Sequence, residues 1–202
     1  TKVVIEIPHK NFEIEGMEAK LSVEASINRI KERIEPLLEV RISTNSQKGK
    51  TTISFNKDNQ SLVMREIRRY LGDDYTCKDF RIPKDIFSLS SNLKIEFLRG
   101  LSDVTAHIRS SNNAYGDKYG HRIYIEIPHN WFLVVDICNL LKDLDVPVQN
   151  IDWGHPNIRD PHLGDYNKGK TKVWFREHQI KIFAEEFEKI GFSIEHKKRA
   201  LK

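Results

Sequence analysis

Cysteine is scarce in this chain, which has only Cys77 and Cys138 among its 202 residues. Two cysteines are too few for a disulfide scaffold or a four-cysteine zinc site. No apolar run approaches the roughly 20 residues that a membrane-spanning helix needs. Residues 1–6 lack the apolar stretch of a secretory signal peptide. These absences argue against a secreted disulfide-rich protein and against a membrane partner, and they favour a cytoplasmic, intracellular location.

Neither sign of charge is in large excess. Lys and Arg number 33 and Asp and Glu number 29, which gives a formal net charge of +4 and a pI near 8.9. Charged residues make up 31% of the chain and hydrophobic residues 39%. This composition indicates an ordinary globular protein of one or two domains and excludes a disordered chain. The mild positive charge permits a polyanionic partner without demonstrating one. Because the first residue is Thr1, an excised piece of a longer protein is one interpretation.

The spacing of apolar residues predicts the same succession of elements twice. Strands are predicted at 3–7, 19–23, 40–42, 53–55, 106–109, 122–127, 148–153 and 171–175. Helices are predicted at 26–37, 59–71, 84–89, 93–101, 131–144 and 177–190. Residues 1–73 then form one half, 74–92 a linker, and 93–202 a second half with one additional helix in front. We expect an α+β fold in which each half forms an antiparallel sheet with helices on one face.

A short string also recurs. Residues 5–9 and 125–129 both read Ile-Glu-Ile-Pro-His. The two copies fall at different predicted strand positions within their halves, so common origin and chance both remain open.

The additional helix carries a recognisable motif. Residues 97–106 read FLRGLSDVTA and resemble the signature helix of the LAGLIDADG homing endonucleases. Four residues match the motif in register: Leu98, Gly100, Leu101 and Asp103. Residues 80–94 look like the approach to that family's second motif, and residues 190–197 look like its C-terminal end. The resemblance, which covers nearly the whole chain, implies a pseudo-symmetric saddle of two curved antiparallel sheets that binds double-stranded DNA.

The chain departs from this family at the positions that carry the chemistry. The eighth motif position is a metal-binding carboxylate in the family, and here it is Thr105. Asp103 is at the sixth position, which is usually structural, and Gly100 is expected where two signature helices approach closely. Only Thr1 precedes the first strand, so either the chain is truncated or the fold has lost one motif. The resemblance therefore implies a DNA-binding scaffold with no catalytic residue, no metal site and no cofactor.

The candidate DNA-binding residues belong to the open face of the expected sheets and to two loops. Arg and Lys neutralise phosphates and read guanine, and Asn and Ser add hydrogen bonds. A merely solvated sheet face is the alternative, and Glu6 and Glu126 on the same face favour it. The predicted DNA-binding residues are Lys2, Lys20, Arg41, Ser43, Ser54, Asn56, His107, Arg109, Ser111, Asn113, Arg122, Tyr124, Arg159, Lys170, Lys172, Trp174 and Arg176.

Three further segments have two interpretations each. The loops at 110–120 and 154–169 either contact groove edges and phosphates or are hairpin tips. The histidines and aspartates at 155–165 could be read as a metal cluster, but their spacing matches no known ligand pattern, and a proline-rich loop is the simpler interpretation. The basic tail at 196–199 either contacts phosphate or is a solvated run of charge.

These observations lead us to expect sequence-specific recognition of double-stranded DNA by a cleavage-deficient domain. Such a domain suits the target-recognition part of a larger nuclease, restriction system or regulator, in which a separate domain or subunit supplies cleavage or motor activity. One alternative is a Mg²⁺-dependent DNA endonuclease with displaced carboxylate ligands, Asp103 among them. The other is an RNA- or protein-interaction module, for which Tyr124 and Trp174 are the obvious stacking residues.

Overall fold

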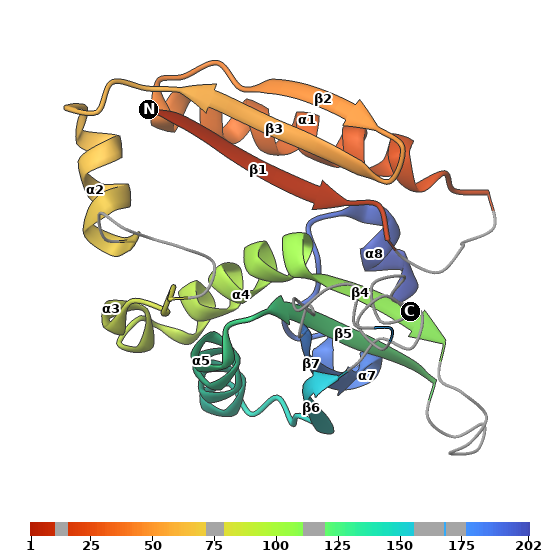
Figure 1. Cartoon of the computed structure of the whole chain (residues 1–202). Coiled ribbons are helices and arrows are strands. Elements are labelled where there is room, and N and C mark those ends of the chain that lie inside the picture. Colours follow the sequence, from red (N-terminus) through yellow and green to blue (C-terminus); the bar gives the residue numbers. More distant parts are fainter. Residues whose placement is uncertain (11–15, 72–78, 111–119, 156–167, 169–176) are drawn as a thin grey trace.

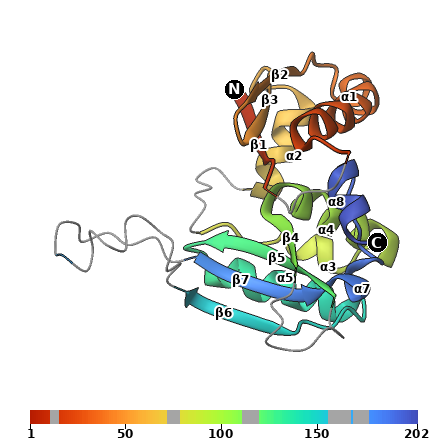
Figure 2. The same cartoon turned by 90° about the vertical axis from the view of Figure 1, so that its right-hand side faces the viewer.

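The computed structural model describes residues 1–10, 16–71, 79–110, 120–155, 168 and 177–202. Within these residues the chain has an α+β fold with two antiparallel sheets (Figures 1 and 2). The first unit contains β1 (Lys2–Pro8), α1 (Ala19–Leu38), β2 (Ser43–Gln47), β3 (Lys50–Asn56) and α2 (Leu62–Leu71). After α3 (Lys84–Phe87), the second unit contains α4 (Ser91–Thr105), β4 (Ala106–Ser110), β5 (His121–Pro128), α5 (Trp131–Asp143), β6 (Asn150–His155), β7 (Glu177–Phe183), α7 (Ala184–Phe187) and α8 (Glu195–Ala200).

The second unit holds the larger core, built around β5. Ile123, Ile125 and Ile127 alternate along this strand and are at most 2% exposed. Helix α5 covers that face with Val134 and Ile137, which are fully buried. The helix starts at Asn130, whose side-chain oxygen accepts a hydrogen bond from the Leu133 backbone N–H at 2.9 Å. The sheet order is β4-β5-β7-β6. None of the described helices is long and apolar enough to cross a membrane.

The first unit has a smaller core that it shares with the end of the chain. Ile7 of β1 packs with Val23 and Ile27 of α1 and with Ile194, which immediately precedes α8. Val23 and Ile27 are four residues apart, so they lie on one face of a helix. Residues 19–23 therefore belong to α1, and the prediction of a strand there is wrong.

The two units share a topology. The first sheet has the order β1-β3-β2, which matches β5-β7-β6 of the second sheet. In both units the first of these strands leads to a long helix, a pair of strands and a final helix. The recurring Ile-Glu-Ile-Pro-His string falls on β1 and β5, which are the equivalent strands. Each copy has proline as the last strand residue, where the missing N–H suits the end of a ladder. The structure thus places the two copies at corresponding positions.

Another prediction fails near the C-terminus, where residues 177–190 were expected to be helical. Residues 177–183 instead form β7, which lies between β5 and β6, and only Ala184–Phe187 follow as a short helix. Ile180 and Ile182 are fully buried, and they alternate with Gln179 and Lys181, which lie on the opposite face of the sheet. The predicted strand at 171–175 lies outside the described residues.

Contacts between the units occur where β1 meets α4 and where α1 meets α8. Figure 1 shows the C-terminal end of β1 close to the end of α4, and Figure 2 shows α1 and α8 next to each other. The end of the chain therefore joins the first unit to the second.

Candidate nucleic-acid interface

The second sheet has a polar face opposite its core. Alternate strand residues point to opposite sides, so Arg122, Tyr124 and Glu126 of β5 face away from the buried isoleucines. Cross-strand register places Tyr124 opposite His107 of β4 and Lys181 of β7. We call this surface the second polar face. Its described polar residues are His107, Arg109, Arg122, Tyr124, Glu126, Asn150, Asp152, Glu177, Gln179 and Lys181.

Tyr124 is at the middle of this face, between two cations. The guanidinium carbon of Arg109 lies 4.9 Å from the ring centroid, and Nζ of Lys181 lies 5.6 Å from it. The His107 ring stacks against Tyr124 with centroids 5.5 Å apart. Cations over an aromatic ring are attracted to its negative face. These contacts hold Arg109 close to the sheet.

Glu126 organises the charges beside Tyr124. Its carboxylate accepts hydrogen bonds from Lys10 Nζ at 2.6 and 2.8 Å, from Gln179 Nε2 at 3.3 Å and from Arg109 Nη2 at 3.5 Å. Lys10 follows the end of β1, so this ion pair also links the two units. Lys181 pairs with Asp152 at 2.5 Å. Burial and the charge of Glu126 raise the pKa of Glu177. With Lys10, the described residues of the face carry four basic and three acidic side chains, whose charges nearly balance.

Two of the predicted DNA-binding residues on this face are buried. His107 is 2% exposed and Arg122 is 6% exposed. Burial, followed by the charges of Lys10 and Arg109, lowers the pKa of His107 to about 2, so its ring is neutral. The prediction that both side chains face solvent is therefore wrong. Among the described residues of this face and Lys10, the accessible cations are Arg109 and Lys10, whose side chains are 43% and 46% exposed.

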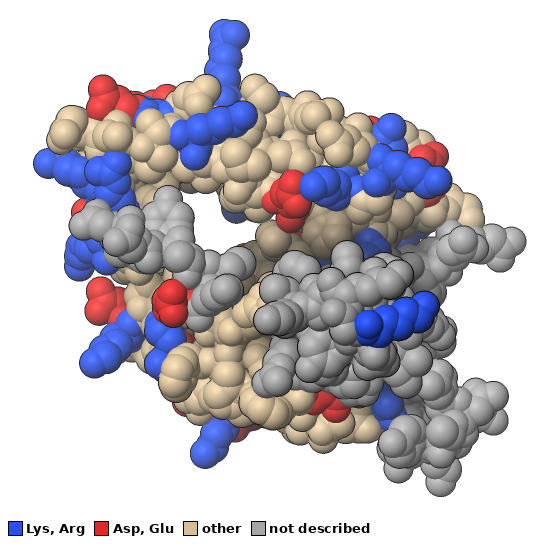
Figure 3. All heavy atoms as spheres, in the orientation of Figure 1, with Lys and Arg blue, Asp and Glu red and all other residues tan. Residues whose placement is uncertain are grey.

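The first sheet also has a polar face, and four predicted residues share it. Ser54 of β3 lies opposite Ser43 of β2, and Asn56 lies opposite Lys2 of β1. Glu6 and Lys50 on the same face form an ion pair at 2.5 Å. We call this surface the first polar face. On the side shown in Figure 3, Lys and Arg side chains are spread over the first unit with acidic side chains between them.

The remaining predicted residues are elsewhere. Lys20 lies in the first turn of α1, not on a sheet face, and Arg41 lies in the connection before β2. The others lie outside the described residues: Ser111, Asn113, Arg159, Lys170, Lys172, Trp174 and Arg176. Most of both predicted loops, including the aspartates of the suggested metal cluster, is also outside them. In the described part of the chain, no group of three or more His, Cys, Asp or Glu side chains could hold a metal ion.

Sequence reasoning missed Lys10 and Lys181. Lys181 was predicted to lie in a helix, so its alternation with the buried isoleucines of β7 was not recognised as a strand pattern. Lys10 follows the short recurring string at the end of β1, and nothing in the local pattern indicates that it reaches the second sheet.

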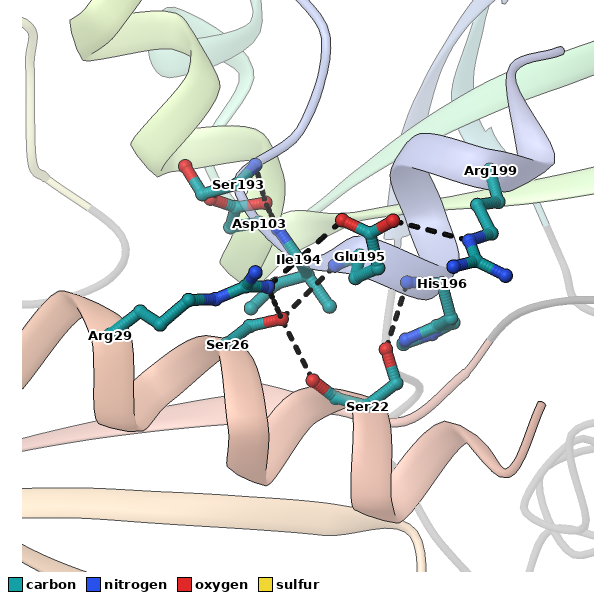
Figure 4. A network of polar contacts seen from close by, with 9 residues as sticks. All are labelled: Ser22, Ser26, Arg29, Asp103, Ser193, Ile194, Glu195, His196 and Arg199. Carbon is teal, nitrogen blue, oxygen red and sulfur yellow. Dashed lines mark hydrogen bonds and ion pairs between the residues drawn. The ribbon is translucent and has the colours of Figure 1, made fainter.

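Asp103 of α4 caps the start of α8. It is 6% exposed, and its carboxylate accepts hydrogen bonds from the backbone N–H groups of Ser193 at 3.0 Å and Ile194 at 3.3 Å (Figure 4). Burial raises the pKa of Asp103, and these hydrogen bonds partly offset that effect. The carboxylate is thus directed at the backbone of the chain's last segment, which is a structural role.

Two serines of α1 complete this cap. Ser26 Oγ accepts a hydrogen bond from the Glu195 N–H at 3.1 Å, and Ser22 Oγ accepts one from the His196 N–H at 2.9 Å (Figure 4). The first N–H groups of a helix lack partners within the helix. Here four consecutive N–H groups are bound by side chains from both units, so the cap also joins the units. We call this arrangement the α8 cap.

The C-terminal end of α4 is bound by an amine. Lys197 is fully buried, and its Nζ donates hydrogen bonds to the carbonyl oxygens of Asp103 at 2.8 Å and Ala106 at 2.7 Å. Thr105, at the position where the resemblance implies a carboxylate, donates its hydroxyl proton to the Leu101 carbonyl of the same helix at 2.8 Å. For Lys197, both interpretations of the basic tail are wrong, because the side chain is neither solvated nor available to phosphate.

The surroundings of Gly100 also differ from the sequence-based expectation, which was that a second signature helix approaches closely at this residue. A Cβ atom at this position would meet no atom within 4 Å, so no second helix approaches it among the described residues. We expect Gly100→Ala to raise the free energy of unfolding by about 0.5–1 kcal/mol, because alanine favours the helix over glycine. Urea denaturation would measure the change.

Gly49 provides the matched control for this substitution. It also faces open space, but its φ is +93°, a conformation that disfavours alanine. Gly49→Ala should therefore destabilise the chain. Destabilisation by Gly100→Ala would show that another segment packs against α4.

No family model matches the chain, and a search of the curated proteins finds no significant match. Function is therefore inferred from the sequence and from the site's own residues.

Proposed function

We propose that this chain recognises double-stranded DNA in a sequence-specific manner through its two polar faces, on a LAGLIDADG-like pseudo-symmetric saddle, and that it does not cleave DNA by itself. The main support is the repeated architecture: two antiparallel sheets of matching strand order, each with a helix-covered apolar face and a face rich in polar side chains. Strands that present alternate side chains in this way can enter the major groove.

The charges favour recognition by individual residues over attraction by a large basic surface. The charges of the described residues of the second polar face nearly balance, so these residues offer little of the non-specific attraction that a basic surface has for phosphates. Arg109 is accessible, and its guanidinium is held by Tyr124 and Glu126. Such positioning suits bidentate contact with a guanine edge. Serine and asparagine side chains on the first polar face can donate and accept hydrogen bonds.

The α8 cap supports the absence of cleavage. Metal-dependent cleavage needs carboxylate oxygens directed at an ion. The oxygens of Asp103 are instead bound by backbone N–H groups, and Thr105 is bonded within its own helix. This geometry disfavours the endonuclease alternative. It fits the target-recognition part of a larger nuclease, restriction system or regulator whose separate domain or subunit supplies cleavage or motor activity.

Selection of bound duplexes from a random library, with and without Mg²⁺, tests this proposal. We expect enrichment of one duplex sequence under both conditions and no product shorter than the input. Failure to enrich a sequence, or stronger competition by RNA or single strands than by duplex, would contradict DNA recognition. Mg²⁺-dependent cutting would instead support the endonuclease alternative.

Arg109→Ala should weaken binding to the selected duplex by about 1–3 kcal/mol if its guanidinium contacts a base. Fluorescence anisotropy would measure the affinity, and thermal unfolding would verify that the variant is folded. Arg65→Ala is the matched control, because Arg65 is exposed on α2 and belongs to neither polar face. Equal affinities for the wild type and both variants would count against the second polar face.

A further inference from the structure

A pocket of about 750 Å³ lies at the junction of the two units. Its walls come from α1, from α4 and from residues 188–202. Buried apolar residues contribute to its lining: Ile190 is 0%, Phe192 is 3% and Leu201 is 8% exposed. Pockets of this size commonly bind ligands. None of its lining residues belongs to either polar face, so it is separate from the candidate nucleic-acid interface.

The rim of this pocket is basic. Among the described residues, five basic side chains line it against three acidic ones: Arg29, Arg33, Arg99, Lys198 and Lys202 against Glu96, Glu188 and Glu195. Two of the acids already have cationic partners, because Glu96 pairs with Arg99 and Glu195 pairs with Arg199 at 3.1 Å. Arg33 and Lys198 are exposed and form no ion pair with the described residues. These two cations are therefore available to an acidic ligand.

The arrangement of hydrogen-bond donors distinguishes between acidic ligands. A compact phosphate group is usually held by convergent backbone N–H groups, often at the start of a helix. The N–H groups at the start of α8 border this pocket, but Asp103, Ser26 and Ser22 already bind them (Figure 4). The free cations instead belong to different helices, on long flexible side chains. That arrangement suits carboxylates spaced along an extended chain.

We propose that this pocket binds an acidic peptide segment of a partner protein. One side chain of the segment lies against Leu201, the most exposed of the three buried apolar lining residues, while flanking Asp or Glu residues pair with Arg33 of α1 and Lys198 of α8. Because the pocket walls come from both units, the bound segment also holds α1 against the end of the chain. The inference does not depend on DNA recognition.

The probe is a short fluorescein-labelled glutamate peptide with one central benzoylphenylalanine, titrated into the full chain and followed by anisotropy. Irradiation should cross-link the aromatic residue to the pocket floor, near Phe192 or Leu201, as mapped by mass spectrometry. The double variant Arg33→Glu/Lys198→Glu should bind about tenfold more weakly, because two rim contacts become repulsive. Arg65→Glu, which makes the same change on α2, should bind like the wild type. Glu188→Gln, which removes a rim acid, should bind more tightly.

Cross-links confined to other surfaces, or unchanged affinity in the double variant, would refute the proposal. Inorganic tripolyphosphate that displaces the probe better than unlabelled peptide does would also refute it and would identify a phosphate site. Duplex binding measured on the same variants keeps the two proposals separate. The rim variants should retain DNA affinity, and Arg109→Ala should retain peptide affinity.

Discussion

Asp103→Ala is expected to lower the free energy of unfolding by about 2–4 kcal/mol, because it removes a buried, charge-assisted helix cap. The carboxylate binds two consecutive N–H groups at the start of α8 and is 6% exposed. Without it, those groups remain away from water with no acceptor. The same loss weakens the contact of α8 with α1, since Ser22 and Ser26 bind the next two N–H groups.

Urea denaturation at neutral pH would measure this loss, and Thr105→Ala in the same helix is the matched control. The Thr105 hydroxyl bonds only a carbonyl of its own helix, so its removal should change stability by less than about 0.5 kcal/mol. The endonuclease alternative makes the opposite prediction. An Asp103→Ala variant that is as stable as the wild type, but no longer cuts DNA with Mg²⁺, would identify a catalytic carboxylate.

The fold could be predicted from the sequence where one apolar period dominates. Residues 122–127 alternate strictly, and 131–144 have helical spacing, so β5 and α5 were predicted close to their observed bounds. Prediction failed where short charged segments fit both the two-residue alternation of a strand and the spacing of a helix. Residues 19–23 alternate for a few positions, yet Val23 pairs with Ile27 on a helix face. Residues 177–183 contain glutamate and lysine, but pairing with β5 and β6 on both sides makes them a central strand.

The candidate site could be predicted in its placement but not in its contacts. Alternation correctly placed Arg109 and Tyr124 on one face of β5 and its neighbour. It could not indicate that Arg122 is buried, because burial depends on what covers the strand. Neither could it show that Lys10 crosses from the first unit to Glu126, more than one hundred residues away.

The recurring string illustrates the same limit. The predicted strand at 19–23 made 5–9 appear to be the first strand of its half, whereas 125–129 belonged to the second strand. Once those residues are recognised as the start of α1, β1 and β5 occupy the same place in each topology. A single misassigned segment therefore concealed the correspondence between the two units.

Lys197 gives the chain an unusual dependence of stability on alkaline pH. Burial lowers the pKa of Lys197 from 10.5 to about 8. Because an uncharged amine still has two N–H groups, it can keep its bonds to both carbonyl oxygens at the end of α4. The native chain then loses this proton near pH 8, whereas the unfolded chain keeps it until about pH 10.5. Between these values the unfolded state binds more protons, so the contribution of Lys197 to stability rises with pH.

Comparison with Lys197→Met isolates this contribution, since methionine retains the apolar stem and cannot titrate. The difference in unfolding free energy, wild type minus variant, should increase by on the order of 3 kcal/mol from pH 8 to pH 10.5. Urea denaturation across that range would measure it. Lys198→Met is the matched control, because Lys198 is exposed on the same helix. The difference in unfolding free energy between the wild type and this variant should not change over the same pH range. Parallel stability curves for the wild type and Lys197→Met would mean that the Lys197 amine remains charged inside the protein throughout this range.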